Sequence, residues 1–262
     1  MRCWPGREKG THLFFLTTWQ GVATVQACRD PRATPPGGYV YHALNRGTAH
    51  LTLFRKPADY DAFRRILKEA LGRHPTRLLG YCLMPTHWHV VLWPERDGQL
   101  TALLRWLALT HSVRWQAHYH SVGSGHVYQN RFKAFPVAED EHLLALLRYV
   151  ERNPLRAGLV RRAEDWAWSS LADRVAGGEA ARWLHPGPVP VPGDWVRWVN
   201  EPQTEAELDA VRASVVRGRP YGSAEWVQGV VERLGLQATV RPRGRPRKGR
   251  PETATGDPGP EK

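Results

Sequence analysis

The chain has 262 residues, a formal net charge of +12 and a sequence pI near 10.1. A single hydrophobic core commonly serves about 100 to 200 residues, so we expect one sizeable domain with appendages. Hydrophobic residues make up 42% of the sequence, which excludes a wholly disordered chain. No apolar stretch reaches the ~18–20 residues of a membrane span. The positive charge, carried largely by arginine, favours a polyanionic partner, first of all nucleic acid.

The three cysteines (Cys3, Cys28, Cys82) are far apart and form no CxxC pair. Neither a disulfide framework nor a zinc site is therefore indicated. Met1 to Thr34 lacks the basic start, the apolar middle and the cleavage site of a signal peptide. We therefore expect an irregular leader over residues 1–36 and a cytoplasmic, membrane-free protein.

The first half of the chain predicts three strands and two helices. A strand is expected from Tyr39 to Leu44, after the turn-forming Pro35 to Gly38, and an amphipathic helix from Asp59 to Leu71. Two short apolar runs, Arg77 to Met84 and His87 to Trp93, predict adjacent strands with a tight connection. A helix from Thr101 to His118 follows, with its apolar side chains facing inward: Leu103, Leu104, Leu107 and Val113.

A fourth strand is expected around Phe132 to Phe135. Asp140 and Glu141 then begin a helix that cannot continue regularly past Pro154. The order strand, helix, strand, strand, helix, strand, helix predicts an α+β, ferredoxin-like antiparallel sheet with helices on one face. Two later helices, Thr204 to Val216 and Ser223 to Leu236, predict a small helical extension.

The sequence His87-Trp88-His89 lies in a predicted strand, where alternate side chains share a face. Two imidazoles about 6 to 7 Å apart along the strand can converge on one divalent ion. Two ordinary polar residues on a half-exposed face are the other interpretation.

Tyr149 and Asn153 occupy positions i and i+4 of the helix that begins at Asp140. They are therefore expected on one helix face, where a hydroxyl and an amide oxygen are presented together. A tyrosine at the edge of the core and an asparagine that closes the helix before proline fit the same pattern. His142 could assist as a base, but a histidine at a helix start more often faces solvent.

Several motifs occur together in order: Met84 to His89 (MPTHWH), Tyr128 to Lys133 (YQNRFK), Tyr149 to Val160 (YVERNPLRAGLV) and Trp168 to Ser170 (WSS). In this combination the chain resembles the REP-associated tyrosine transposases, which are single-tyrosine HUH enzymes related to the transposases of small insertion sequences. The resemblance covers roughly residues 38–171, and residues 217–248 are similar to the family's C-terminal extensions.

The resemblance implies a ferredoxin-like catalytic domain that cuts single-stranded, hairpin-forming repeat DNA. It implies that His87 and His89 hold Mg²⁺ or Mn²⁺ and that Tyr149 is the nucleophile, which forms a 5′-phosphotyrosine link. Asn153 stands where related enzymes place a third metal ligand, often glutamine. Both dimeric and monomeric relatives are known, so a homodimer is compatible with the resemblance.

The expected organisation is an irregular leader (1–36), an HUH catalytic domain (37–172), a mostly helical extension (173–240) and a basic tail (241–262). Arg131 and Lys133 are two residues apart at the predicted fourth strand, so they share a face and could follow a DNA backbone, although such a pair is also typical of a solvated edge. The aromatic residues Tyr128, Phe132 and Phe135 fit base stacking and core packing equally well.

The tail sequence from Arg241 to Lys248 (RPRGRPRK) resembles an AT-hook. In that motif extended arginines, here Arg243, Arg245 and Arg247, enter the narrow minor groove of A/T-rich duplex DNA. A tail that binds phosphates without sequence preference is an equal alternative.

Three functions compete at this stage. The first is an active transposase and single-strand endonuclease, and the presence of both histidines and Tyr149 favours it. The second is a domesticated protein of the bacterial nucleoid that binds repeat hairpins without transposition. The third is a metal hydrolase that activates water and does not need Tyr149, for which a neighbouring carboxylate is missing.

Overall fold

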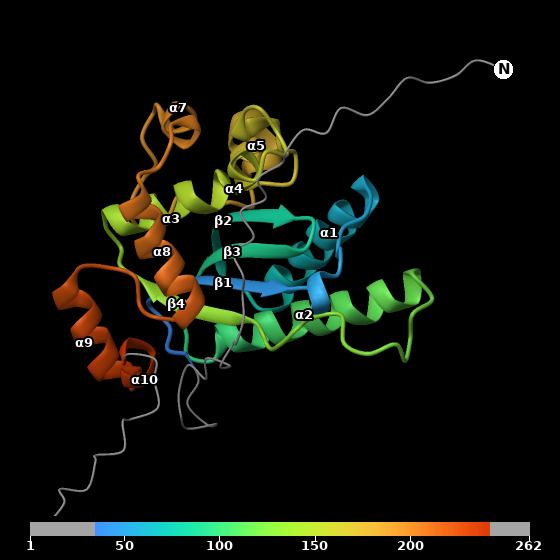
Figure 1. Cartoon of the computed structure of the whole chain (residues 1–262), viewed down its shortest axis with the longest axis horizontal. Helices are drawn as coiled ribbons and strands as arrows, with labels where there is room; N and C mark the ends of the chain where they lie inside the picture. The colour runs from blue at the N-terminus through green and yellow to red at the C-terminus, as the bar shows by residue number, and fades with distance from the viewer. Residues whose placement is uncertain (1–34, 242–262) are drawn as a thin grey trace, which may run out of the picture.

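The computed structural model describes residues 35–241. Four strands form one sheet in the order β2-β3-β1-β4, as Figure 1 shows from top to bottom. The strands are β1 (Val40–Arg46), β2 (Arg77–Met84), β3 (His87–Trp93) and β4 (Lys133–Val137). All neighbouring strands are antiparallel, and α1 (Pro57–Arg73) and α2 (Gln99–His118) connect β1 to β2 and β3 to β4. The ferredoxin-like α+β class is thereby confirmed.

One face of the sheet is covered by α1 and α2. Their apolar stripes pack with Trp88, Val90 and Leu92, the side chains of β3 that alternate onto this face. Leu103, Leu104 and Leu107 are buried in α2 as predicted. Val113 was wrongly predicted to face inward, because the helix buries His111 and Trp115 instead and leaves Val113 57% exposed.

The opposite face of the sheet carries α3 (Glu141–Glu151), so the prediction that helices cover only one face is wrong. Leu143, Leu146, Leu147 and Val150 of α3 share an apolar cluster with β-strand residues such as Val91 and Phe135. The physical reason is that β2 and β3 are apolar on both faces, so both faces must be buried.

Local sequence explains where α3 begins and how closely it approaches the sheet. Asp140 caps the helix, because its side chain accepts a hydrogen bond from the backbone N–H of His142. Gly80 lies beneath the helix at an irregularity in β2, where a Cβ atom would approach Leu147 Cδ2 to 2.7 Å. Glycine therefore allows α3 to lie close to the strand that neighbours β3.

The remaining helices follow α3 along the chain. They are α4 (Asn153–Arg156), α5 (Ser170–Ala176), α6 (Gly178–Ala181), α7 (Trp195–Asn200), α8 (Glu205–Arg217), α9 (Ala224–Leu234) and α10 (Gln237–Val240), with short 3₁₀ turns η1 (Thr48–His50) and η2 (Ala163–Asp165). Helices α7 and α8 bury side chains in the same apolar cluster as α3. Within residues 35–241, no helix combines the length and apolar character of a membrane span.

Candidate functional site

The two histidines of β3 lie side by side on the face of the sheet that α3 covers. The ring centroids of His87 and His89 are 5.0 Å apart, with the rings nearly perpendicular. His89 is buried and His87 is half-buried. Burial, followed by the positive charges of Arg46 and Arg156, lowers the pKa of His87 to about 3. Burial also holds the pKa of His89 well below its usual value, so both imidazoles remain neutral at physiological pH.

The Nε2 atom of His89 is buried and has no hydrogen-bond partner among residues 35–241. Its Nδ1 atom lies 2.9 Å from Nε2 of His42, a fully buried histidine of β1. Buried polar atoms are almost always paired, so this unpaired imidazole nitrogen beside a second histidine is a candidate position for a metal ligand.

Tyr149 reaches the histidines from α3. Its ring centroid lies 6.3 Å from that of His89, in an edge-to-face arrangement, and the residue is 8% exposed. The apolar residues on either side of it, such as Leu146 and Val150, are buried in the core and fix the rotation of the helix. The same chain therefore supplies both the tyrosine and the paired histidines.

Asn153 belongs to a separate short helix, which corrects the prediction of one continuous helix. Helix α3 ends at Glu151, Arg152 caps it, and Asn153 begins α4 together with Pro154 at its second position. Arg152 keeps right-handed helical backbone angles, so the chain continues with little change of path. The Oδ1 atom of Asn153 accepts a hydrogen bond of 2.8 Å from Arg156 Nη2. One lone pair of that oxygen stays available to a further partner.

Two arginines that were not predicted from the sequence lie beside Tyr149 and His87. The guanidinium of Arg156 lies over the Tyr149 ring, 4.2 Å from its centroid. Arg46 of β1 stands directly opposite His87 in the strand register, and its Nε atom is buried without a partner in the described chain. Burial lowers the pKa of both arginines from a very high starting value. The site thus combines positive charge with neutral nitrogen and oxygen ligands, as a bound phosphate and cation would need.

The residues expected to hold DNA do not form the predicted pair. Arg131 is exposed and lies before β4 rather than in it. Lys133 is buried in β4, and its Nζ donates a hydrogen bond to the carbonyl oxygen of Val216 at 3.3 Å. Tyr128 and Phe135 are buried core residues. The tail residues Arg243, Arg245 and Arg247 lie outside the described residues.

A second group of possible ligands lies at the start of α3, where Asp140, Glu141 and His142 bring one atom each within 4.8 Å of one another. Helix capping accounts for this group, because Asp140 Oδ1 accepts from the backbone of His142 and lies 2.8 Å from its Nδ1 atom. The His142 ring packs against Tyr221, about two helical turns before Tyr149.

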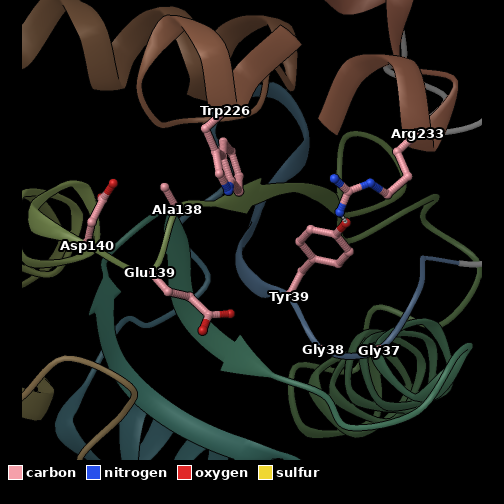
Figure 2. Close-up of a pocket in the computed structure, with 8 residues that line it drawn as sticks. All are labelled: Gly37, Gly38, Tyr39, Ala138, Glu139, Asp140, Trp226 and Arg233. Atoms are coloured by element: carbon pink, nitrogen blue, oxygen red, sulfur yellow. Dashed lines mark hydrogen bonds between the residues drawn. The ribbon is translucent and has the colours of Figure 1, made fainter. Parts of the chain in front are cut away.

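A cavity of about 580 Å³ adjoins the start of α3, between the residues that precede β1 and helix α9. Figure 2 shows the Trp226 indole on one side and the Tyr39 phenol beside Arg233, whose Nη1 donates to the Tyr39 hydroxyl at 2.7 Å. Glu139 and Asp140 also line the cavity, and their negative charges disfavour a phosphate. The paired histidines and Tyr149 are not among its lining residues.

Comparisons with known proteins found a family model and a curated relative that resemble this chain. Residues 38–153 match the family model described as IS200-like transposase. A curated protein of Haemophilus influenzae, provisionally assigned as a REP-associated tyrosine transposase, is 24% identical over 122 residues, which cover 43% of this chain and 69% of that protein.

Two solved structures are also similar. One, of a REP-associated tyrosine transposase bound to a REP hairpin, has a TM-score of 0.45 and 20% identity, and the match covers 59% of this chain and 86% of that one. The other, of a Deinococcus radiodurans protein provisionally assigned as a transposase, has a TM-score of 0.33 and 15% identity, over 43% of this chain and 88% of that one. The chain is thus similar to the IS200-like transposases over residues 38–153, and to a protein provisionally assigned as a REP-associated tyrosine transposase.

Proposed function

We propose that this protein is a metal-dependent endonuclease and strand transferase that acts on single-stranded DNA through a covalent 5′-phosphotyrosine intermediate. Tyr149 is the nucleophile in this proposal, and the substrate is hairpin-forming repeat DNA, as the family resemblance implies. The observation that carries the proposal is the contact between Tyr149 and His89, whose Nε2 atom is buried and unpaired.

The donor atoms at the site fit a divalent cation. His87 and His89 offer neutral imidazole nitrogens, and Asn153 Oδ1 offers a hard oxygen, a mixture that suits Mn²⁺ and is compatible with Mg²⁺. A bound Mg²⁺ or Mn²⁺ would polarise the scissile phosphate and stabilise charge on its oxygens. Asn153 is the weakest member of the set, because Arg156 already donates to its oxygen.

The chain itself performs the transfer. The Tyr149 oxygen forms a bond to phosphorus while the bond from phosphorus to O3′ breaks. The phenol loses its proton, and the departing O3′ takes one up and becomes a free 3′-hydroxyl. Arg156, at 4.2 Å from the Tyr149 ring centroid, is placed to stabilise negative charge on the phenolic oxygen and the phosphate. Attack of a 3′-hydroxyl on the phosphotyrosine reverses the step and joins the strands.

DNA beyond the site would be held by basic residues at the surface. Arg131 is exposed and fits this role, whereas the Lys133 ammonium group is buried and donates to the backbone carbonyl of Val216. The tail arginines Arg243, Arg245 and Arg247 would add contacts to A/T-rich duplex DNA. Such substrates would place the protein at the bacterial nucleoid. A single chain suffices for cleavage, since His89 and Tyr149 are in contact within it, and a homodimer would then serve strand exchange.

The decisive experiment traps the covalent adduct. Hairpin oligonucleotides with single-stranded flanks are incubated with the full chain and Mn²⁺, one set labelled at the 3′ end and one at the 5′ end. The 3′ label should appear in a denaturation-resistant adduct with the protein. The 5′ label should appear in a shortened free strand that terminal transferase can extend.

Tyr149→Phe should abolish the adduct, whereas Tyr119→Phe is the matched control, because that hydroxyl bonds to Asp59 on the other side of the sheet. His87→Ala and His89→Ala should abolish cleavage and keep DNA binding. Undiminished cleavage by Tyr149→Phe would instead favour a water-activating metal hydrolase. Hairpin binding without cleavage in any metal would favour the domesticated DNA-binding protein.

A further inference from the structure

His42 occupies a position behind the paired histidines that no part of the proposed chemistry uses. It lies on β1, is fully buried, and faces the same side of the sheet as His89. The two rings are stacked, 5.1 Å apart and tilted by 8°, and Phe135 of β4 closes the other side of His42 at 5.0 Å. The His42 ring is thus held in one orientation against His89.

The single hydrogen bond between the two rings joins Nε2 of His42 to Nδ1 of His89 at 2.9 Å. A neutral imidazole carries hydrogen on one nitrogen and a lone pair on the other. If His42 donates, the hydrogen of His89 must be on Nε2, and that nitrogen cannot bind a cation. If His89 donates from Nδ1, its buried Nε2 presents a lone pair. The direction of this one hydrogen bond therefore decides whether His89 is a ligand.

We propose that His42 is a positioning residue that accepts a hydrogen bond from Nδ1–H of His89 and thereby presents Nε2 of His89 to the metal ion. The inference rests on the proposed metal site and adds a partner behind it. A metal-ligating histidine commonly gives its other N–H to such an acceptor, and loss of the acceptor weakens metal binding. Without His42, the Nδ1–H group of metal-bound His89 would be a buried donor with no partner.

If His42 had a purely structural role, its replacement would destabilise the metal-free fold. Its own Nδ1 atom is buried and has no hydrogen-bond partner in the part of the chain that the structure describes. The side chain therefore stabilises the metal-free fold poorly, since a buried polar atom without a partner is unfavourable. Replacement by an apolar ring of similar size should leave the metal-free protein as stable as before and still weaken metal binding.

The test compares three full-length variants with the wild type: His42→Phe, which removes the acceptor, His42→Gln, which restores one, and His111→Phe as a control. His111 is also buried, but it lies in α2 on the opposite face. Mn²⁺ dissociation constants are measured from the electron paramagnetic resonance signal of free Mn²⁺, without DNA. We expect about a 10- to 100-fold weaker affinity for His42→Phe. His42→Gln should recover most of the affinity, and His111→Phe should keep it.

Two further readouts separate the inference from a folding defect and from the proposed function. The melting temperature of metal-free His42→Phe should equal or exceed that of the wild type. Correlation spectra of ¹⁵N-labelled histidine should show hydrogen on Nδ1 of His89 in the Mn²⁺-free wild type and a shift toward Nε2 in His42→Phe. Wild-type Mn²⁺ affinity and an unchanged tautomer in His42→Phe would overturn the inference alone. A wild type that binds no Mn²⁺ would overturn the metal site and this inference with it.

Discussion

Glu151 should be one of the most costly residues to remove, although it is not part of the chemistry. It is the last residue of α3, two positions after Tyr149, and it is completely buried. Its Oε1 atom lies 3.2 Å from Arg174 Nε and accepts from Ser170 Oγ at 2.5 Å. Its Oε2 atom accepts from Trp195 Nε1 at 2.6 Å. One carboxylate thus holds α5 and α7 against the helix that carries Tyr149.

Removal of one partner from a buried ion pair typically costs about 3–5 kcal/mol, because the other charge is left unpaired. Arg174 keeps 17% of its side-chain surface exposed and also donates to the carbonyl of Leu79, so we expect Glu151→Ala to lie near the lower end, at about 3 kcal/mol. For a chain of this size that corresponds to a fall of about 6–12 °C in melting temperature. Glu151→Gln keeps the shape and one acceptor, and should cost about 1–2 kcal/mol.

The assay is urea unfolding followed by tryptophan fluorescence, with Glu179→Ala as the matched control. Glu179 also pairs with an arginine, Arg182, but both side chains are more than three-quarters exposed (82% and 76%). Such surface pairs contribute at most about 1 kcal/mol. If the free energies of unfolding of Glu151→Ala and Glu179→Ala differ by less than about 1 kcal/mol, burial does not explain the contribution of the Glu151 carboxylate to stability.

Three further predictions concern the core, pH and the composition of the site. Gly80→Ala should destabilise the fold by about 1–3 kcal/mol, because its Cβ atom would meet Leu147 Cδ2 at 2.7 Å. The control Gly72→Ala, on α1, places its Cβ atom in open space and should stabilise the fold by about 0.5–1 kcal/mol. The same urea titration measures both variants. Stability should fall as pH drops below about 6.5 toward 3, because the unfolded chain binds protons that three histidines of the folded chain do not, at about 1.4 kcal/mol per pH unit each. Unfolding midpoints at pH 7.5, 6 and 5 test this. Burial lowers the pKa of each of these histidines to about 3: His42, His87 and His111. Mixing Tyr149→Phe with His89→Ala protein should restore no adduct, because tyrosine and histidine act within one chain; recovery of activity would indicate a shared site between subunits.

The sequence was sufficient to predict the four strands, the helices α1, α2, α3, α8 and α9, and the placement of His87 and His89 on one face. Alternation along a strand places these two side chains on one face whatever the rest of the fold does. Helical spacing likewise predicted that Tyr149 and Asn153 share one helix face. The second covered face of the sheet could also have been predicted, because β2 and β3 are continuous apolar runs, which are typical of strands buried on both sides.

The residues around the histidines could not be predicted in the same way. His42 and Arg46 meet His89 and His87 only through the register of β1 on β3, in which Leu44 pairs with His89 and Arg46 with His87. A shift of one residue would turn both side chains to the other face. Arg156 depends on the path of the chain from α3 into α4, which the proline after Asn153 does not fix. The sequence predicts that Lys133 contacts DNA, because alternation along a strand does not show which face other elements of the fold will cover.

The segment from Arg148 to Arg156 links α7 and the residues after it to the proposed site. Its polar side chains divide by helical spacing into two sets. One set consists of Tyr149, which contacts His89, of Arg156, which lies over the Tyr149 ring, and of Asn153, which accepts a hydrogen bond from Arg156. The other set faces the segment from Trp195 to Pro202: Arg148, Glu151 and Arg152.

Two residues of the second set bind the helix to the segment from Trp195 to Pro202. Arg148 donates to the carbonyl oxygens of Trp198, Glu201 and Pro202, and Arg152 donates to that of Val199. Each of these carbonyls belongs to α7 or its end, so the C-terminal segment fixes the rotation and position of the helix pair α3–α4. In the proposed mechanism, the distance from the tyrosine oxygen to a phosphate must be held to within a fraction of an ångström. We therefore expect changes at this remote interface to lower the rate of cleavage before they weaken DNA binding.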